Sequence, residues 1–375
     1  MADWIRVDDP GELIVAMPAM LGFVPERSLV IAVLRAGKPP CVTPVIDAVA
    51  RFELEPPGGR RGMAARIAEC LSRICAAEQA DEVLAVIIDD RANEPGPRQA
   101  NPRRMEQAAM HTALIVALDQ CLAAYEVMLA GAWAVSAIHA GEHWWPLLGA
   151  PCGGVLPDPA QSSVAMSSVL DGRPIHASRS ELTAVLAPDT ELCEQVSAQV
   201  EAALENARER RVRAARHGEE DSYRRALLER VLWQVAHAES HVLPDAPEIA
   251  GLLPALQDPK VRSTLFALAY TEQATAVEKL WLRLVQALPL HYRADAATLL
   301  GYSAYVRGDG AFAGMALDVA LESDPGYEMA GLLECGLRSG MRPGPLRRVG
   351  RSGHAMAADL GVDLGPLVES AEVSR

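Results

Sequence analysis

The sequence is poor in aromatic residues and carries none of the common motifs of catalysis. Aromatic residues make up only 5% of its 375 residues. It has no Walker-type phosphate loop, no G-x-G-x-x-G after a strand and no G-x-S-x-G elbow. Nucleotide hydrolysis on a P-loop, dinucleotide-dependent redox chemistry and serine hydrolysis on an elbow therefore find no support in the sequence.

Long apolar runs and a secretory signal are also missing. No apolar run reaches the roughly 18 residues that a membrane-spanning helix needs, and the N-terminus lacks a basic segment followed by an apolar one. The seven cysteines, at 41, 70, 75, 121, 152, 193 and 335, are scattered and odd in number. This pattern favours free thiols over a disulfide framework. We expect a cytoplasmic protein without membrane association.

Excess positive charge is lacking as well, since the formal net charge is -14. Such a charge argues against nucleic acid or an anionic membrane as a general partner. One basic run, Arg208 to Arg216, interrupts the acidic balance. Acidic residues at 201, 205, 209, 219, 220 and 221 surround it, which predicts a solvated helix with ion pairs between neighbouring turns. We expect no nucleic-acid partner.

The N-terminal half alternates strands and helices. Apolar segments at 28–35, 43–54, 81–90, 127–138 and 143–148 predict strands, and 61–79 and 104–124 predict two long helices. A short helix is expected over 10–21, broken near Pro18. The pattern predicts an α/β domain with a mixed sheet of about five strands, in residues 1–158.

The C-terminal half is helical throughout. From Ser162 onwards every periodic segment has helical spacing, interrupted by proline-containing breaks. We expect an all-helical domain over residues 159–350 and a flexible C-terminal tail over 351–375.

The sharpest pattern of the chain lies between Ala294 and Tyr327 and resembles a tetratricopeptide repeat. Small or apolar residues stand where that helix–turn–helix unit needs them, at 300, 301, 304, 313, 317, 320 and 321. Gly308 and Asp309 are expected to turn the chain, and Pro325 to end the second helix. We predict helices over 294–307 and 310–323. Tyr302, Tyr305 and Arg307 are the candidates for contact with a protein partner.

Carboxylates at strand ends are the candidate catalytic or ligand-binding groups. Asp89 and Asp90 end the most apolar strand, and Asp47 lies in the preceding one. Ligands of open α/β sheets usually bind beyond the carboxyl ends of strands, and carboxylates can hold a divalent cation or act as acid and base. The alternative is that these acids only end strands and cap the next segment of the chain.

A second candidate cluster surrounds the expected hairpin at residues 140–142. His139, His143 and Cys152 could ligate a metal, but a structural zinc site needs four ligands and no fourth is evident. Surface or partly buried hairpin residues are the competing interpretation. Trp144 and Trp145 next to them suit either core packing or stacking on a ligand. No cofactor is expected.

Several segments together resemble an uncharacterised actinobacterial family, domain of unknown function 4192. They include L-G-F-x-P-x-x-S-L-V at 21–30, V-L-A-V-I-I-D-D at 83–90 and S-S-V-L-D-G-R-P at 167–174. D-P-K-V-R at 258–262 and the glycine-rich segment at 308–325 complete the pattern, which covers roughly residues 5 to 350. Where typical members carry C-C-P-x-x-G, this chain has P-C-G-G. The resemblance implies a layout and a host group but no activity.

The sequence thus leaves the function unknown, but it favours a binding protein over an enzyme. We expect a non-enzymatic interaction or regulatory protein whose helical domain docks a protein partner. The alternative is a small-ligand-binding protein or metal-dependent enzyme that uses carboxylates at the strand ends. Partner identity and oligomeric state are not encoded in any recognisable pattern.

Overall fold

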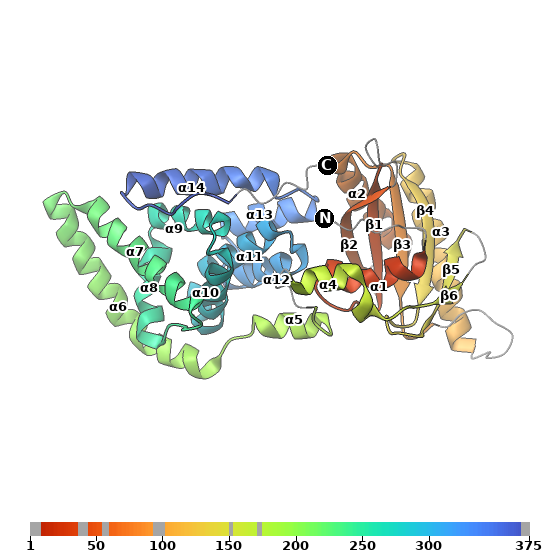
Figure 1. Ribbon diagram of the computed structural model, residues 1–375, viewed down its shortest axis with the longest axis horizontal. Helices are drawn as coiled ribbons and strands as arrows, with labels where there is room; N and C mark the ends of the chain where they lie inside the picture. Colours follow the sequence, from red (N-terminus) through yellow and green to blue (C-terminus); the bar gives the residue numbers. More distant parts are fainter. Residues whose placement is uncertain are drawn as a thin grey trace. The chain divides into compact units, whose positions relative to one another are not determined.

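The chain divides into an α/β unit and a helical unit. The computed structural model describes residues 9–36, 44–54, 60–92, 102–149, 153–170 and 175–368. The α/β unit comprises Met1–Leu182 with Arg338–Met341, and the helical unit comprises Thr183–Leu337 with Arg342–Arg375 (Figure 1). A mixed α/β part and a helix-rich remainder are what the sequence predicts.

The described part of the α/β unit contains one six-stranded mixed sheet with the strand order β2-β1-β3-β4-β5-β6. Its strands are β1 (Ser28–Arg35), β2 (Val45–Glu53), β3 (Glu82–Ile88), β4 (Met128–Val135), β5 (His143–Leu148) and β6 (Gly154–Val155). Only the β3–β4 pair is parallel, and the other neighbours are antiparallel. The sixth strand, β6, has two residues, too few to carry an alternating pattern.

Strand direction decides which residues share an edge of the sheet. Ser28 at the start of β1 lies opposite Ile88 at the end of β3. Ile88 in turn pairs with Val135 at the end of β4. One end of the sheet therefore brings together the residues that follow β3, those that follow β4 and those that precede β1.

Helices cover both faces of the sheet. On one face α2 (Arg60–Glu78) and α3 (Pro102–Ala123) pack on alternate residues of the strands, among them Leu29, Ile31 and Ile87. Figure 1 shows α1 (Pro10–Leu21) in front of the opposite face. Because β1 and β3 are buried on both faces, their sequences are continuous apolar runs rather than alternating ones. The remaining helices of this unit are η1 (Pro159–Gln161) and α4 (Ser163–Leu170).

The first helix is continuous, contrary to the expected break near Pro18. Asp9 caps it by accepting a hydrogen bond from the Gly11 N–H at 2.8 Å. Pro18 removes one backbone hydrogen bond from its middle. Leu13 and Met17 are fully buried, so packing on the sheet outweighs that loss.

The helical unit contains ten α-helices in its described residues, counting α5, which straddles the boundary. They are α5 (Arg179–Val185), α6 (Thr190–His217), α7 (Glu220–Glu239), α8 (Ala246–Gln257), α9 (Pro259–Leu265), α10 (Ala274–Ala287), α11 (Arg293–Arg307), α12 (Gly310–Ser323), α13 (Glu328–Arg338) and α14 (Arg347–Asp359). Three short 3-10 helices are η2 (Phe266–Tyr270), η3 (Leu290–Tyr292) and η4 (Gly344–Leu346). Trp281 and Tyr302 are its largest fully buried side chains.

The two helices expected near residues 294 and 310 are present as α11 and α12. Gly308 ends α11 in the left-handed conformation, with φ of 88°. Asp309 then caps α12 by accepting a hydrogen bond from the Phe312 N–H. A Cβ placed on Gly301 would lie 2.9 Å from Leu317 Cγ, so a glycine is required where the two helices approach.

Two boundaries differ from the expected arrangement, that between the two units and that of the C-terminal tail. The α/β unit extends past residue 158, to Leu182. Helix α14 occupies residues expected to form a flexible tail, and Leu360 and Val362 beyond it are buried. Gly353 explains the packing, because a Cβ there would lie 2.4 Å from the Ser263 carbonyl oxygen. Residues 369–375 of the expected tail lie outside the described residues.

Candidate functional site

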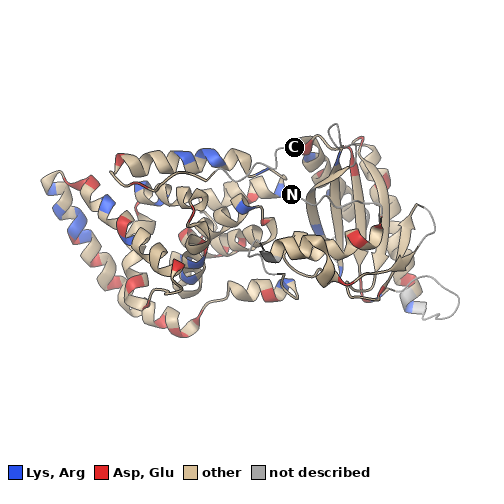
Figure 2. Cartoon of the chain, viewed as in Figure 1, with Lys and Arg blue, Asp and Glu red and all other residues tan. Residues whose placement is uncertain are grey.

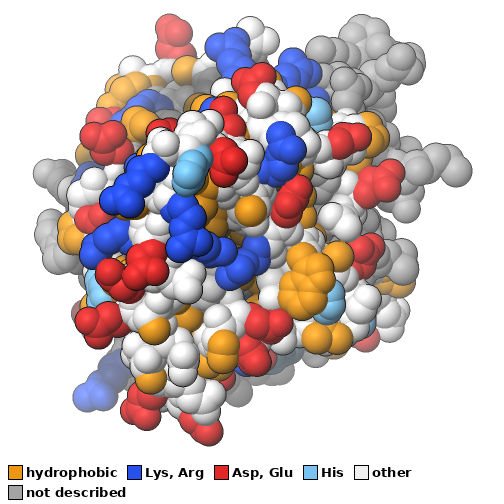
Figure 3. All heavy atoms as spheres, turned by 90° about the vertical axis from the view of Figure 1, so that its left-hand side faces the viewer, with side chains coloured by type: hydrophobic (Ala, Val, Ile, Leu, Met, Phe, Trp, Pro, Cys, Tyr) orange, Lys and Arg blue, Asp and Glu red, His pale blue; other side chains and the backbone are white. Residues whose placement is uncertain are grey.

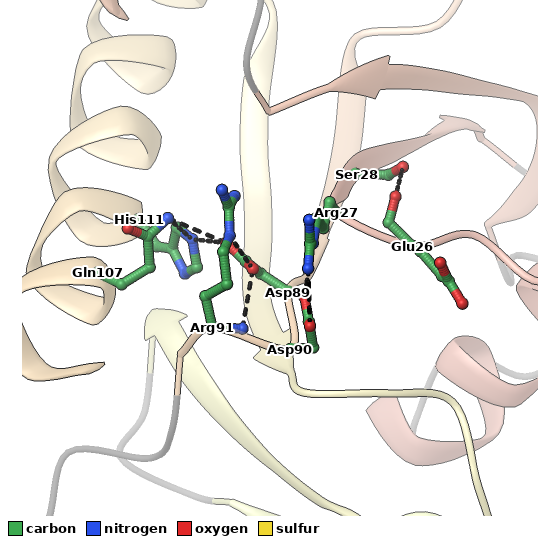
Figure 4. A network of polar contacts seen from close by, with 8 residues as sticks. All are labelled: Glu26, Arg27, Ser28, Asp89, Asp90, Arg91, Gln107 and His111. Atoms are coloured by element: carbon green, nitrogen blue, oxygen red, sulfur yellow. Dashed lines mark hydrogen bonds and ion pairs between the residues drawn. The ribbon is translucent and has the colours of Figure 1, made fainter. Parts of the chain in front are cut away.

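The strongest polar cluster of the α/β unit lies at the end of β3. Asp89 follows this strand directly, and its side chain is fully buried. Its backbone N–H donates to the Val135 carbonyl oxygen at 3.0 Å, which holds the residue against the end of β4. Figure 4 shows α3 side chains reaching Asp89 from one side.

Four groups donate hydrogen bonds to the Asp89 carboxylate. Arg91 donates from Nε at 2.8 Å, from Nη2 at 3.0 Å and from its backbone N–H at 3.0 Å. Gln107 Nε2 lies 3.0 Å away and His111 Nε2 lies 2.9 Å away, both on Oδ2 (Figure 4). Both carboxylate oxygens are thus engaged by the chain itself.

These contacts determine the ionisation of Asp89. Burial alone would raise its pKa, because a buried charge loses its hydration. The hydrogen bonds from His111, the Arg91 N–H and Gln107 outweigh burial and hold the pKa of Asp89 below its ordinary value. A carboxylate with a lowered pKa is a weak base at neutral pH, so Asp89 is poorly suited to general-base catalysis.

His111 is the least satisfied member of this cluster. An ionised carboxylate can only accept hydrogen bonds, so His111 Nε2 carries the proton that it shares with Asp89. Its other ring nitrogen, Nδ1, is buried and has no hydrogen-bond partner among the described residues. Buried polar atoms are normally paired, so this nitrogen marks a place where a hydrogen-bond partner is missing.

Asp90 belongs to a separate and solvent-exposed ion pair. Its oxygens accept from Arg27 Nε at 2.8 Å and Arg27 Nη2 at 3.1 Å. Arg27 has a positive φ of 43°, which is uncommon for a residue with a side chain. In the contacts drawn in Figure 4, Asp90 is bonded to Arg27, whereas Asp89 is bonded to Arg91, Gln107 and His111. Asp47 lies within β2, and its side chain is outside the described part of the structure.

The structure gives no support to a metal cluster at the hairpin. His139 and His143 are both exposed, and Cys152 lies outside the described residues. Across the described ranges, no three His, Cys, Asp or Glu residues are grouped so that they could hold a metal ion. Trp144 and Trp145 are 6% and 3% exposed, so their rings belong to the core.

Two of the three residues expected to contact a partner on α11, Tyr302 and Tyr305, point into the helical unit instead. Tyr302 and Tyr305 are 0% and 3% exposed. The Tyr302 hydroxyl donates to the Leu346 carbonyl oxygen at 2.9 Å. Arg307 is paired with Glu278, whose Oε1 lies 3.0 Å from its Nε. The prediction that Tyr302 and Tyr305 contact a partner is therefore wrong, because the chain's own helices cover both side chains.

A different surface of the helical unit carries exposed basic and aromatic side chains. Within the run Arg208 to Arg216, only Arg208 forms an ion pair with a described residue, Glu205. The expected pairing along the run is wrong for its other arginines. Figure 2 shows the basic residues of α6 in its C-terminal half, where Glu205 and Glu209 also lie. On α7, Trp233 is 51% exposed and its ring centroid lies 3.8 Å from that of His237.

Comparison with known proteins identifies the family. The family described as Domain of unknown function (DUF4192) matches residues 10–344. The chain belongs to the DUF4192 family. Searches of curated proteins and of solved structures found no match. Membership therefore assigns a family without assigning an activity.

Three polar residues of the DUF4192 strand-end cluster escaped the sequence analysis. Arg91, Gln107 and His111 join Asp89 only through the fold. A signal existed for two of them, since Gln107 and His111 are four residues apart on α3 and so share one helix face. None of the described helices is long and apolar enough to cross a membrane.

Proposed function

We propose that this DUF4192 protein is a non-enzymatic binding protein that docks a protein partner on its helical unit. The docking surface comprises Arg210 and Arg211 of α6 with Arg230, Trp233 and His237 of α7. The half-exposed Trp233 carries the proposal. Large aromatic side chains are costly to leave in water, and Trp and Arg are the residues most enriched at the energetic centres of interfaces.

The ionisation and hydrogen bonding of Asp89 in the strand-end cluster support a role without catalysis. The Asp89 carboxylate is ionised, buried and bonded to Arg91, Gln107 and His111. These contacts stabilise the loop after β3 against α3 and leave the Asp89 carboxylate unavailable as a general base. The α/β unit then serves as a scaffold or sensor, and the helical unit provides the docking surface.

The α11–α12 pair fits a tetratricopeptide-like unit in this proposal. Support comes from the close approach at Gly301 and the turn at Gly308. With its tyrosines buried, this pair would build the helical unit rather than touch the partner. The excess of Arg over Lys and the absence of disulfides in the described residues agree with an actinobacterial, cytoplasmic protein.

Site-specific photo-crosslinking tests the docking surface. A photoreactive phenylalanine analogue is placed at Trp233, or as a matched control at Leu332, which is 68% exposed on α13 of the same unit. After irradiation in the native host, we expect a discrete adduct at position 233 that is absent at 332. The same adducts at both positions, or none at 233, would contradict the proposal.

The His111 Nδ1 atom favours a second candidate, a small ligand bound beside the strand ends. A ligand with a hydrogen-bond donor could supply the partner that this buried nitrogen lacks. A metabolite screen by thermal shift, repeated on His111→Leu, tests this function. A compound that raises the melting temperature of the wild type and leaves His111→Leu unchanged would support it; a screen without such a compound would not.

A further inference from the structure

Four side chains of α7 lie along one stripe of the helix. Tyr223, Arg230, Trp233 and His237 follow one another at intervals of seven, three and four residues. These intervals return to the same side of an α-helix, since each turn takes about 3.6 residues. Trp233 therefore adjoins Arg230 one turn away, and Tyr223 lies two turns before Arg230.

Arginines of α6 come to the same place. The Tyr223 hydroxyl donates to the Ala207 carbonyl oxygen at 3.3 Å. Arg210 and Arg211 are three and four residues after Ala207, so both lie about one turn from this contact. Burial raises the pKa of Tyr223, while the charges of Arg210, Arg211 and Arg230 all lower it. The positive charges of three arginines on two helices thus lower the pKa of one hydroxyl.

A glycine on α8 makes room for the third arginine. Arg230 Nη1 lies 3.5 Å from the Gly251 carbonyl oxygen. A Cβ at position 251 would lie only 2.9 Å from this nitrogen, so any larger residue would displace the guanidinium. The Arg230 side chain therefore occupies its position because residue 251 is glycine.

The arginines of this cluster have no ion-pair partner among the described residues. Arg211 and Arg230 have no ion pair there, and the buried Nε of Arg210 has no hydrogen-bond partner there. Asp258 is the nearby carboxylate that raises the pKa of Tyr223. It is already engaged by Arg224 and by the backbone N–H groups that it caps at the start of α9.

We propose that Arg210, Arg211 and Arg230 bind a phosphate monoester carried by the docked partner. Guanidinium groups suit phosphate, because their planar donors match its oxygens in pairs. Three arginines whose charges act on the same hydroxyl supply more positive charge than a single carboxylate needs, and this suits a dianion. Figure 3 shows several Lys and Arg side chains on one face of the chain, with Asp and Glu side chains among them. An exposed site with Trp233 one turn from Arg230 on the same helix suits a phosphorylated protein segment rather than an enclosed metabolite. This inference rests on the proposed docking function.

Calorimetric titration of the full chain tests the site. The probes are inorganic phosphate, with chloride at matched ionic strength, and a blocked phosphoserine tripeptide with its unphosphorylated form. We expect phosphate and the phosphopeptide to bind and the other two to fail. Arg211→Gln and Arg230→Gln should each weaken binding about tenfold or more, the loss of one hydrogen bond to a charged group. Equal melting temperatures will show that the variants fold.

Arg213→Gln is the matched control. Arg213 lies on α6, is exposed and forms no ion pair among the described residues, but it is absent from the groups that act on Tyr223. Its binding should stay within about twofold of the wild type, whereas an equal loss would show a non-specific charge effect and overturn the site. Binding of phosphate without the phosphopeptide would overturn its assignment to a protein segment.

The two proposals fail in different ways. An adduct at position 233 without any phosphate binding refutes the phosphate site and leaves the docking function standing. Phosphate binding that depends on Arg230, without an adduct at 233, refutes protein docking and with it the protein source of the phosphate.

Discussion

Replacing Asp89 with asparagine should open the end of β3. The change keeps the size of the side chain but removes the charge that Arg91, Gln107 and His111 share. The new amide N–H₂ would also face donors. Breaking a buried charged pair costs about 3–5 kcal/mol. Arg91 is 29% exposed and can regain water, so we expect the lower end, about 3 kcal/mol.

Hydrogen exchange is the suitable assay, because two units need not unfold in one transition. The free energy of opening is read from β3 and α3 peptides, corrected for intrinsic exchange rates. Asp90→Asn is the control, since it removes an adjacent carboxylate that is 60% exposed. Exposed pairs contribute about 0.2–1 kcal/mol, so this variant should change little. Equal opening energies in both variants would refute the argument that the Asp89 network stabilises the edge.

The same network predicts a pH dependence. The pKa of Asp89 is lower in the folded chain than its ordinary value of 3.8. The folded state therefore gains stability from Asp89 above that ordinary value and loses it as the pH falls towards the lower, folded pKa. Protection of β3 should decrease below about pH 4 in the wild type, and Asp89→Asn should flatten this decrease. An unchanged slope in the variant would show that other groups cause it.

Three further substitutions test the packing of the two units. Phe23→Ala should cost about 3 kcal/mol or more, because the ring is 3% exposed; hydrogen exchange of β1 measures the loss, and wild-type protection would place the ring outside the core. Gly301→Leu should cost about 1–3 kcal/mol by overpacking against Leu317, seen as a lower urea midpoint of the helical unit, and a wild-type midpoint would contradict the close approach. Tyr302→Phe removes the hydrogen bond to the Leu346 carbonyl and should cost about 1–3 kcal/mol by the same measurement, whereas no change would mean that the carbonyl finds another donor.

Local elements were readable from the sequence wherever one periodicity dominated. The apolar runs of β1 and β3 and the helices α11 and α12 occur close to their predicted bounds. Prediction failed where packing outweighs a local preference. Pro18 stays inside α1 because the helix is held on the sheet, and α14 packs because Gly353 lets it approach Ser263.

For the candidate site too, the sequence predicted one part and the tertiary structure decided the other. The sequence alone indicated acids after the central strand, because a strand of apolar residues followed by Asp89 and Asp90 is a local pattern. Only tertiary structure could separate them, burying one beneath α3 and leaving the other exposed to pair with Arg27.

Burial and pairing were the properties that the sequence could not supply. It predicted ion pairs along α6 because acids stand four residues from its arginines, yet most of those arginines remain unpaired among the described residues. It placed Tyr302 and Tyr305 on a binding surface, and neighbouring helices cover them. Periodicity fixes which residues share one side of a helix, but the elements packed against that side decide whether it meets the core, another charge or water.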